Sequence, residues 1–203
     1  MKILDERRAP NPRRVRVYLA EKGIEVPFEQ VDIMTGAHKS ADFSRLNPVQ
    51  RVPVLILDNG TAISETMAIC RYFEALQPEP SLFGGTPLEI AQVEMWNRRA
   101  ELNFLFPVAQ CFRHSHPAMA ELEKPQVPAW AEANRPRVAE IIGVFDEALK
   151  EKPFLAGNRF SVADITAMIG VDFMKPARLA VPENAAHFKR WYAEVSARPS
   201  YKA

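Results

Sequence analysis

The sequence has few of the features that mark several large protein classes. It contains only two cysteines, Cys70 and Cys111, which form neither a CxxC pair nor a metal-ligand spacing. A secreted disulfide framework and a metal site are therefore not expected. The 26 basic residues nearly balance the 25 acidic ones, so no strong field would attract nucleic acid or an anionic membrane.

Long apolar runs are also missing. The longest uncharged apolar stretch, residues 102–112, contains Pro107 and is much shorter than the roughly 20 residues that span a bilayer. The first residues, MKILDERRAP, carry charges where a signal peptide would need its apolar segment. We therefore expect a soluble, cytoplasmic protein. Its 203 residues, 47% hydrophobic and 25% charged, suffice for one large domain or two small ones.

The first eighty residues change character about every ten positions. Asn11 is a favoured helix N-cap, Pro12 suits a first helical turn, and Gly23 ends the helical pattern. Further on, Asp58-Asn59-Gly60 is typical of a hairpin turn between two short apolar strands. The predicted order is βαβαββα, which resembles the thioredoxin fold. The predicted strands are residues 2–4, 28–31, 54–57 and 61–63, and the predicted helices are 11–22, 41–46 and 66–76.

A linker and a helical domain follow. The sequence QPEPSLFGGTP at residues 77–87 has the proline and glycine content of a linker. No strand-like alternation interrupts the segments beyond it, so we expect an all-helical bundle. The predicted domains are residues 1–78 and 87–203, joined by a linker at 79–86. The predicted helices of the second domain are residues 88–114, 129–150, 162–174 and 185–197.

One acidic residue of the helical domain has a structural explanation. Ser161 can cap the helix that follows, and Asp164 stands three residues later, where it can accept a hydrogen bond from the Ser161 amide. Phe160 and Ile165 occupy the two positions of a hydrophobic staple. The spacing therefore predicts a capping box and gives no reason to assign Asp164 a catalytic role.

Two short segments of the first domain suit an extended peptide ligand. Pro53 precedes a buried strand, and a cis Val52–Pro53 bond would turn the Val52 N–H and C=O outward to pair with a peptide. Glu65-Thr66 starts a helix directly after a strand, where free N–H groups suit a carboxylate and Glu65 suits an ammonium group. Each segment alone can be a plain turn or helix start. Together they predict a site for glutathione.

At these residues the chain resembles the cytosolic glutathione S-transferase family over nearly its whole length. The segments that carry the resemblance are APNPRRVRVYLAEKG, HKSADFSRLNPVQRVPVLILDNG, SET with MAICRYFE, and FSVADIT. The resemblance implies that Val52, beside a cis Pro53, pairs with the cysteinyl unit and that Glu65 and Thr66 hold the γ-glutamyl end. It also implies that His38 and Arg51 contact the glycine carboxylate, although His38 could equally be a solvated loop residue.

The chain departs from the family pattern at the residue that activates the glutathione thiol. In the serine and cysteine classes this residue stands a few positions before the first helix, and the matching residue here is Ala9. Alanine can neither donate a hydrogen bond to a thiolate nor form a mixed disulfide. Tyr18 lies two helical turns further on and is expected to be packed. The usual catalytic group is therefore missing.

Three substitutes remain for activating the sulfur. The N-terminus of the first helix, with Arg13 and Arg14 nearby, favours a thiolate. The Asn11 side-chain amide can donate to the sulfur, although it can instead cap the helix. Phe112-Arg113-His114-Ser115-His116 resembles atypical fungal and bacterial members that lack the usual residue and use a histidine and a serine through water. We choose His114 with Ser115 as candidates; the alternative is a polar helix end.

These features predict an enzyme that conjugates the glutathione thiolate to small hydrophobic electrophiles. Glutathione is then a co-substrate, and no metal takes part. Phe104, Phe106 and Phe112 are candidates to line the electrophile pocket, although aromatic residues of this kind more often belong to the core. By family resemblance we expect a homodimer that binds neither nucleic acid nor a membrane. The missing residue at Ala9 leaves a second function open, in which the protein binds glutathione without catalysis and acts in protein association.

Overall fold

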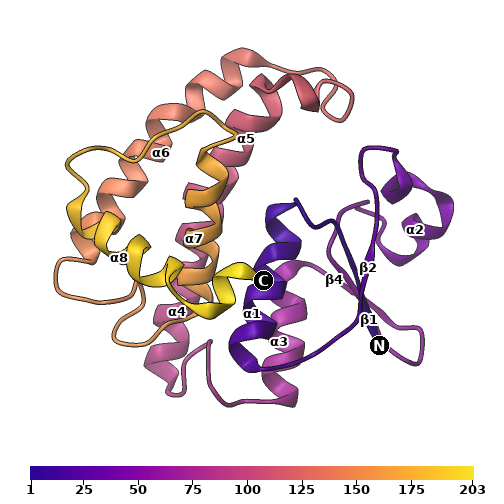
Figure 1. Ribbon diagram of the computed structural model, residues 1–203, viewed down its shortest axis with the longest axis horizontal. Helices are drawn as coiled ribbons and strands as arrows, with labels where there is room; N and C mark the ends of the chain where they lie inside the picture. Colours follow the sequence, from indigo (N-terminus) through magenta and orange to yellow (C-terminus); the bar gives the residue numbers. More distant parts are fainter. The chain divides into compact units, whose positions relative to one another are not determined.

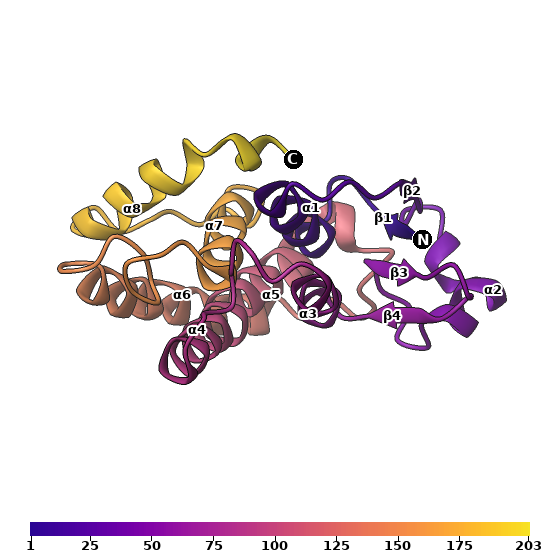
Figure 2. The same ribbon diagram turned by 90° about the horizontal axis from the view of Figure 1, so that it is seen from below.

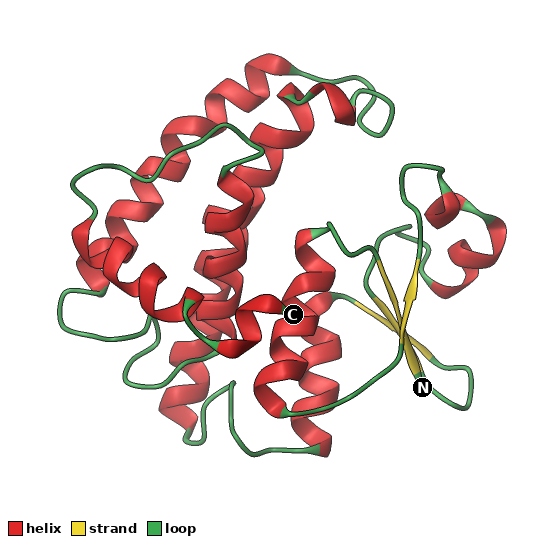
Figure 3. Cartoon of the chain, viewed as in Figure 1, coloured by secondary structure: helices red, strands yellow, loops and turns green.

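A computed structural model describes all residues from 1 to 203 and divides the chain into two compact units. Unit 1 comprises Met1–Pro80 together with Lys202–Ala203, and unit 2 comprises Ser81–Tyr201. Figure 1 follows the chain from one unit into the other, and Figure 3 shows that all strands belong to unit 1. None of the helices combines the length and the apolar composition needed to cross a bilayer.

Unit 1 has the predicted βαβαββα order around a mixed sheet of four strands. The strand order is β2-β1-β3-β4, with β1 parallel to β2 and antiparallel to β3, and β4 antiparallel to β3. Helices α1 and α3 lie on one side of the sheet and α2 lies on the other (Figure 2). The strands are β1 (Lys2–Asp5), β2 (Phe28–Gln30), β3 (Val54–Ile56) and β4 (Ala62–Ser64), and the helices are α1 (Pro10–Lys22), η1 (Ala37–Lys39), α2 (Ala41–Leu46) and α3 (Thr66–Leu76).

Helix α1 corrects one prediction about Asn11. The helix starts at Pro10, so Ala9 is the N-cap and contributes no side-chain cap, while Asn11 is already inside the first turn. The reason is that the fixed φ of Pro10 suits the first helical position and its missing N–H costs nothing there. Gly23 ends the helix as predicted, in the left-handed conformation with φ 64°.

Unit 2 is all helical, as predicted, with one irregular region. The expected helix over residues 88–114 is divided by a π-helical segment, in which the Phe106 N–H bonds to the carbonyl of Glu101, five residues earlier. Pro107 cannot donate to the helical ladder, so some departure from regular α-helix is expected beside it. The elements are α4 (Pro87–Arg99), η2 (Ala100–Leu105), α5 (Phe106–Ser115), η3 (Pro117–Met119), α6 (Pro128–Ala148), α7 (Val162–Met174), α8 (Ala186–Ser196) and η4 (Pro199–Lys202).

Helix α7 forms the centre of unit 2 and begins with the predicted capping box. The Asp164 carboxylate is fully buried and accepts hydrogen bonds from the Ser161 N–H and hydroxyl, both at 3.0 Å. Its other oxygen accepts from the Leu155 N–H and the Trp191 indole N–H, both at 2.9 Å. Asp164 therefore joins the start of α7 to the preceding loop and to α8, which is a structural role. Burial raises the pKa of its carboxyl to about 6.

Candidate functional site

The sheet register brings three loop segments of unit 1 to one end of the strands. Val54 at the start of β3 pairs with Ser64 at the end of β4, so the Val52–Pro53 segment lies beside the Glu65–Thr66 segment. Val54 also pairs with Leu4 near the end of β1, which places the β1–α1 loop at the same end. Strand pairing thus brings the β1–α1 loop together with two segments that follow it by more than forty positions in the sequence.

The loop before β3 exposes the backbone of Val52. The Val52–Pro53 bond is cis, as predicted, and neither the N–H nor the C=O of Val52 takes part in a backbone hydrogen bond. The Val52 side chain is buried against Leu4, Phe43 and Val54. Because the side chain anchors the residue inward, its backbone edge is left available to an extended peptide.

Asn47 shapes this loop, a role that could not be recognised from the sequence alone. Its side-chain amide donates to the Arg51 carbonyl at 2.8 Å, and its side-chain oxygen accepts from the Val49 N–H at 3.1 Å. Asn47 is 1% exposed, so these bonds are shielded from water. An asparagine ahead of a turn is common enough in sequences that its partners could not be inferred without the fold.

The N-terminus of α3 offers unused backbone donors. The first helical hydrogen bond joins the Ile69 N–H to the Glu65 carbonyl, so the N–H groups of Thr66, Met67 and Ala68 have no helical partner. Glu65 is exposed and has φ 71° and ψ 122°, which is a strained conformation for a residue with a side chain. A helix N-terminus beside a carboxylate can bind the acidic and amino groups of one amino-acid head group.

His38 and Arg51 are the two nitrogen-bearing side chains that are predicted to contact the glycine carboxylate. His38 is only 5% exposed, so the alternative of a solvated loop histidine is wrong. Its Nδ1 atom is buried without a hydrogen-bond partner. Burial lowers the pKa of His38, and the positive charges of Lys39 and Arg51 lower it further. The nearby cations and the unused imidazole nitrogen make this a suitable place for a carboxylate.

The first turn of α1 offers fewer donors than a typical helix N-terminus. Pro10 and Pro12 have no N–H, and the Arg13 N–H bonds to the Ala9 carbonyl at 3.3 Å. Asn11 therefore supplies the one backbone N–H of this turn that is open to a ligand. Its side-chain oxygen accepts from Arg14 Nη1 at 3.2 Å, which leaves the side-chain NH₂ as a further donor.

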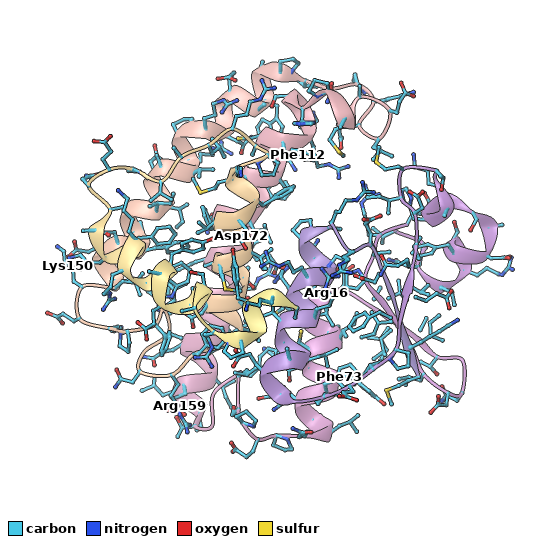
Figure 4. The ribbon with its side chains drawn as sticks, viewed as in Figure 1. Arg16, Phe73, Phe112, Lys150, Arg159 and Asp172 are labelled. Atoms are coloured by element: carbon cyan, nitrogen blue, oxygen red, sulfur yellow. The ribbon has the colours of Figure 1, made fainter.

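A buried ion pair holds the loop that leads into α1. Arg16 donates to the Asp5 carboxylate at 2.6 Å and to the Arg7 carbonyl at 2.8 Å, and its side chain is marked in Figure 4. Gln30 Nε2 donates to the second Asp5 oxygen at 2.7 Å. The Asp5 and Arg16 side chains are 2% and 12% exposed. This network, which sequence reasoning missed, fixes the position of the chain just before Ala9.

Two other side chains of unit 1 that could take part in sulfur chemistry are buried in the core. Tyr18 is fully buried, and its hydroxyl donates to Glu74 at 2.6 Å. Burial and this bond raise the pKa of Tyr18 above its ordinary value, which makes it a poor source of a proton. Cys70 is fully buried, and burial raises the pKa of its thiol to about 12. Both residues are therefore structural.

In unit 2, His114 and Ser115 already have local partners. His114 Nδ1 accepts from the Val127 N–H at 3.1 Å, so the proton of the neutral imidazole is on Nε2, which lies 4.0 Å from Glu123. The lone pair that a direct base would use is thus engaged. The Ser115 hydroxyl donates to the Cys111 carbonyl at 2.6 Å and keeps its oxygen lone pairs. The available groups are a donor on His114 and an acceptor on Ser115.

The three predicted pocket phenylalanines differ in environment. Phe104 is 0% exposed and packs edge-on against Phe145 and Phe188, so it belongs to the core and cannot line a pocket. Phe106 is 50% exposed on α5. Phe112, marked in Figure 4, is partly exposed and contacts the rings of His116 and Phe173, with centroids 4.7 Å and 5.0 Å away.

Comparisons with known proteins agree across both units. Residues 9–76 match the family model "Glutathione S-transferase, N-terminal domain", and residues 104–199 match the corresponding C-terminal domain model. The chain is 40% identical to glutathione S-transferase 2 of Saccharomyces cerevisiae over 205 aligned positions, covering 100% of this chain and 88% of the relative.

Solved structures give the same result. A glutathione S-transferase domain-containing protein from Marinobacter aquaeolei has a TM-score of 0.95 and 42% identity, covering 98% of this chain and 99% of that one. The Gtt2 structure from Saccharomyces cerevisiae also has a TM-score of 0.95, with 40% identity, and the alignment covers 100% of this chain and 99% of that chain.

Proposed function

The chain belongs to the glutathione S-transferase family, and we propose that it conjugates the thiolate of glutathione to small hydrophobic electrophiles. One observation carries this proposal: strand pairing brings the open backbone edge of Val52, the N-terminus of α3 and the N-terminus of α1 to the same end of one sheet. Glutathione has a cysteinyl amide, a zwitterionic head and a thiol, and each of the three segments suits one of these groups.

The proposed binding roles follow from the local chemistry. The Val52 N–H and C=O pair with the cysteinyl unit as a short antiparallel ladder, with Pro53 shaping the turn. The γ-glutamyl carboxylate lies at the Thr66 end of α3, and its ammonium group pairs with Glu65. His38 and Arg51 receive the glycine carboxylate, since both carry nitrogen groups in a positively charged setting.

The proposed reaction needs a stabilised thiolate. Asn11 supplies two donors for the sulfur, its backbone N–H and its side-chain NH₂. The thiol proton leaves to solvent, the thiolate forms a bond to the electrophilic carbon, and the leaving group departs with its electron pair. A hydrogen bond to a charged acceptor contributes about 1.5–3 kcal/mol, and one pKa unit corresponds to about 1.4 kcal/mol, so two donors at the lower end of this range would lower the thiol pKa by roughly two units.

We assign His114 and Ser115 a supporting role, based on their resemblance to the atypical family members. Their local bonds favour water-mediated contact, with His114 Nε2–H as a donor and the Ser115 oxygen as an acceptor. Because Nδ1 of His114 is engaged, we do not assign this residue the role of direct base. The expected effect of His114→Ala is a lower turnover with an unchanged dissociation constant for glutathione, measured by steady-state kinetics and calorimetry.

Residue 9 offers a direct test of where the sulfur binds. In an Ala9→Cys variant incubated with oxidised glutathione, the new thiolate would attack the disulfide, form a mixed disulfide and release one reduced glutathione. We expect much faster formation than in a Val49→Cys control, because Val49 is 60% exposed in the same unit but outside the proposed sulfur site. Equal rates, followed by mass spectrometry, would contradict the proposed placement of the sulfur.

A second function, glutathione binding without catalysis, is favoured by the composition of the α1 N-terminus. Ala9 contributes no donor, and Pro10 and Pro12 remove two backbone N–H groups from the first turn. A protein of this kind would bind glutathione yet leave its thiol pKa at the free value. Turnover of several electrophiles of different chemistry, monitored spectrophotometrically, separates it from the enzyme.

We further propose that the protein is a cytoplasmic homodimer. Leu88, Met95 and Leu102 are seven residues apart along α4 and its π-helical continuation and are 67%, 40% and 48% exposed. Apolar side chains at this spacing form a stripe that is suited to pairing with a second copy. Sedimentation analysis should therefore give twice the chain mass, and Leu102→Glu should shift it to the monomer mass.

A further inference from the structure

Arg14 makes an unusual contact with the residue proposed to bind the sulfur. It lies three residues after Asn11 on α1 and is 1% exposed, whereas Asn11 is exposed. Arg14 Nη1 donates to the side-chain oxygen of Asn11 at 3.2 Å. A buried cation thus holds one end of an exposed carboxamide.

The position of the Arg14 side chain inside unit 1 makes it a rigid donor. Its positive charge acts on the fully buried Cys70 of α3, where it lowers the thiol pKa and partly opposes the effect of burial. A guanidinium enclosed by packing loses much of the rotamer freedom that surface arginines keep. Asn11 Oδ1 is therefore bound to a group that cannot easily move away.

The chemistry of a carboxamide makes this contact directional. Its oxygen only accepts hydrogen bonds and its nitrogen only donates them. With the oxygen bound to Arg14, the NH₂ group is the free end. Rotating the amide by 180° would place its NH₂ group against the guanidinium of Arg14, so that two donors would face each other. It would also place the amide oxygen against the thiolate, so that two acceptors would face each other, and both changes are unfavourable.

We propose that Arg14 is a positioning residue of the sulfur site, which holds the Asn11 carboxamide with its NH₂ group toward the glutathione sulfur. This inference rests on the proposed function, in which Asn11 is the donor to the sulfur. Pro10 and Pro12 support this inference, because they leave the first turn of α1 with few backbone donors. The orientation of a single side-chain donor therefore matters more there.

A mutant cycle on the bound glutathione thiol tests this coupling. The thiol pKa is titrated by thiolate absorbance in the wild type, Asn11→Ala, Arg14→Lys, Arg14→Met and Arg14→Met with Asn11→Ala. We expect Asn11→Ala and Arg14→Met each to raise the pKa by about one unit, the loss of one charge-assisted bond. Arg14→Met should add nothing in the Asn11→Ala background, and Arg14→Lys should restore part of the shift.

A purely electrostatic effect of Arg14 gives a different pattern. It would raise the thiol pKa equally in both backgrounds, and this additive result would overturn the proposal. Arg8→Met is the charge control, because Arg8 is exposed, pairs with Glu6 and belongs to the same end of the unit. We expect it to leave the bound thiol pKa unchanged.

A measurement on the wild type keeps the proposal testable if Arg14 variants do not fold. The Asn11 side-chain amide should show backbone-like order in ¹⁵N relaxation of the glutathione-free protein; a freely rotating amide would overturn the proposal. If the wild type neither binds glutathione nor lowers its thiol pKa, the proposed function fails instead. If Asn11→Ala shifts the pKa while Arg14→Met does not, only the role of Arg14 is refuted.

Discussion

Replacing Asp164 tests how the helical unit is held together. Its carboxylate accepts four hydrogen bonds at 2.9–3.0 Å, from Leu155, from Trp191 and twice from Ser161. The side chain is fully buried at the start of α7. An Asp164→Ala variant would leave three N–H groups without an acceptor, since the Ser161 hydroxyl can reorient but the other donors are fixed.

The size of the expected loss in stability follows from the number of donors left without an acceptor. Each buried unsatisfied N–H costs about 1–3 kcal/mol, and part of this is offset because a desolvated carboxylate is removed. We expect Asp164→Ala to lower the free energy of unfolding by about 4 kcal/mol, a large share of the 5–15 kcal/mol typical of whole proteins. Asp164→Asn keeps one acceptor oxygen and should lose roughly 2–3 kcal/mol.

Urea unfolding followed by circular dichroism measures these changes. Glu140→Ala is the matched control, because Glu140 is exposed on α6, and its effect should stay within about 0.5 kcal/mol. A loss below about 1 kcal/mol for Asp164→Ala would refute the reasoning, because the four bonds would then carry little net stability.

The same carboxyl gives a pH dependence with a definite sign. Burial raises its pKa from 3.8 to about 6, so between these values the folded protein binds more protons than the unfolded chain. The contribution of Asp164 to stability therefore falls as pH rises through this window and is greatest below it. When the pH is lowered from 7 to 4, the free energy of unfolding of the wild type should increase by up to about 3 kcal/mol relative to that of Asp164→Asn.

Three further predictions concern single side chains in both units. Tyr18→Phe removes the hydrogen bond to Glu74 and should cost about 1–2 kcal/mol in urea unfolding, without changing the conjugation rate. Gly170→Ala places a methyl group 2.6 Å from the Phe104 ring and should destabilise unit 2 by about 1–3 kcal/mol in the same assay. Glu65→Gln should weaken glutathione binding roughly tenfold by calorimetry while leaving the unfolding midpoint unchanged, because Glu65 is exposed.

Local sequence signals predicted the fold well where they depend on neighbours in the chain. The helix at 66–76, the helix at 162–174 and its capping box match the structure, because periodicity and capping act over a few residues. The start of α1 was wrong by one residue, since Pro10 competes with Asn11 for the first turn. The π-helical segment η2 gave no signal apart from Pro107.

The candidate site shows where sequence reasoning stops. Sequence motifs were enough to select Val52, Glu65 and Thr66 as candidate residues. Their roles in binding glutathione remain predictions. Asn47 and the pair of Asp5 with Arg16 could not be found, because their partners are set by folding of the chain rather than by spacing. The orientation of the Asn11 amide likewise depends on a contact with buried Arg14 that no motif records.

The pKa of glutathione bound to the wild-type protein tests the central claim most directly. In the proposed mechanism, a family member with Ala9 still activates the sulfur through donors at the start of α1. Titration of the thiolate absorbance should give a bound thiol pKa roughly two units below the free value. A bound thiol that titrates at the free value would contradict the account, and binding without catalysis would then be the better description.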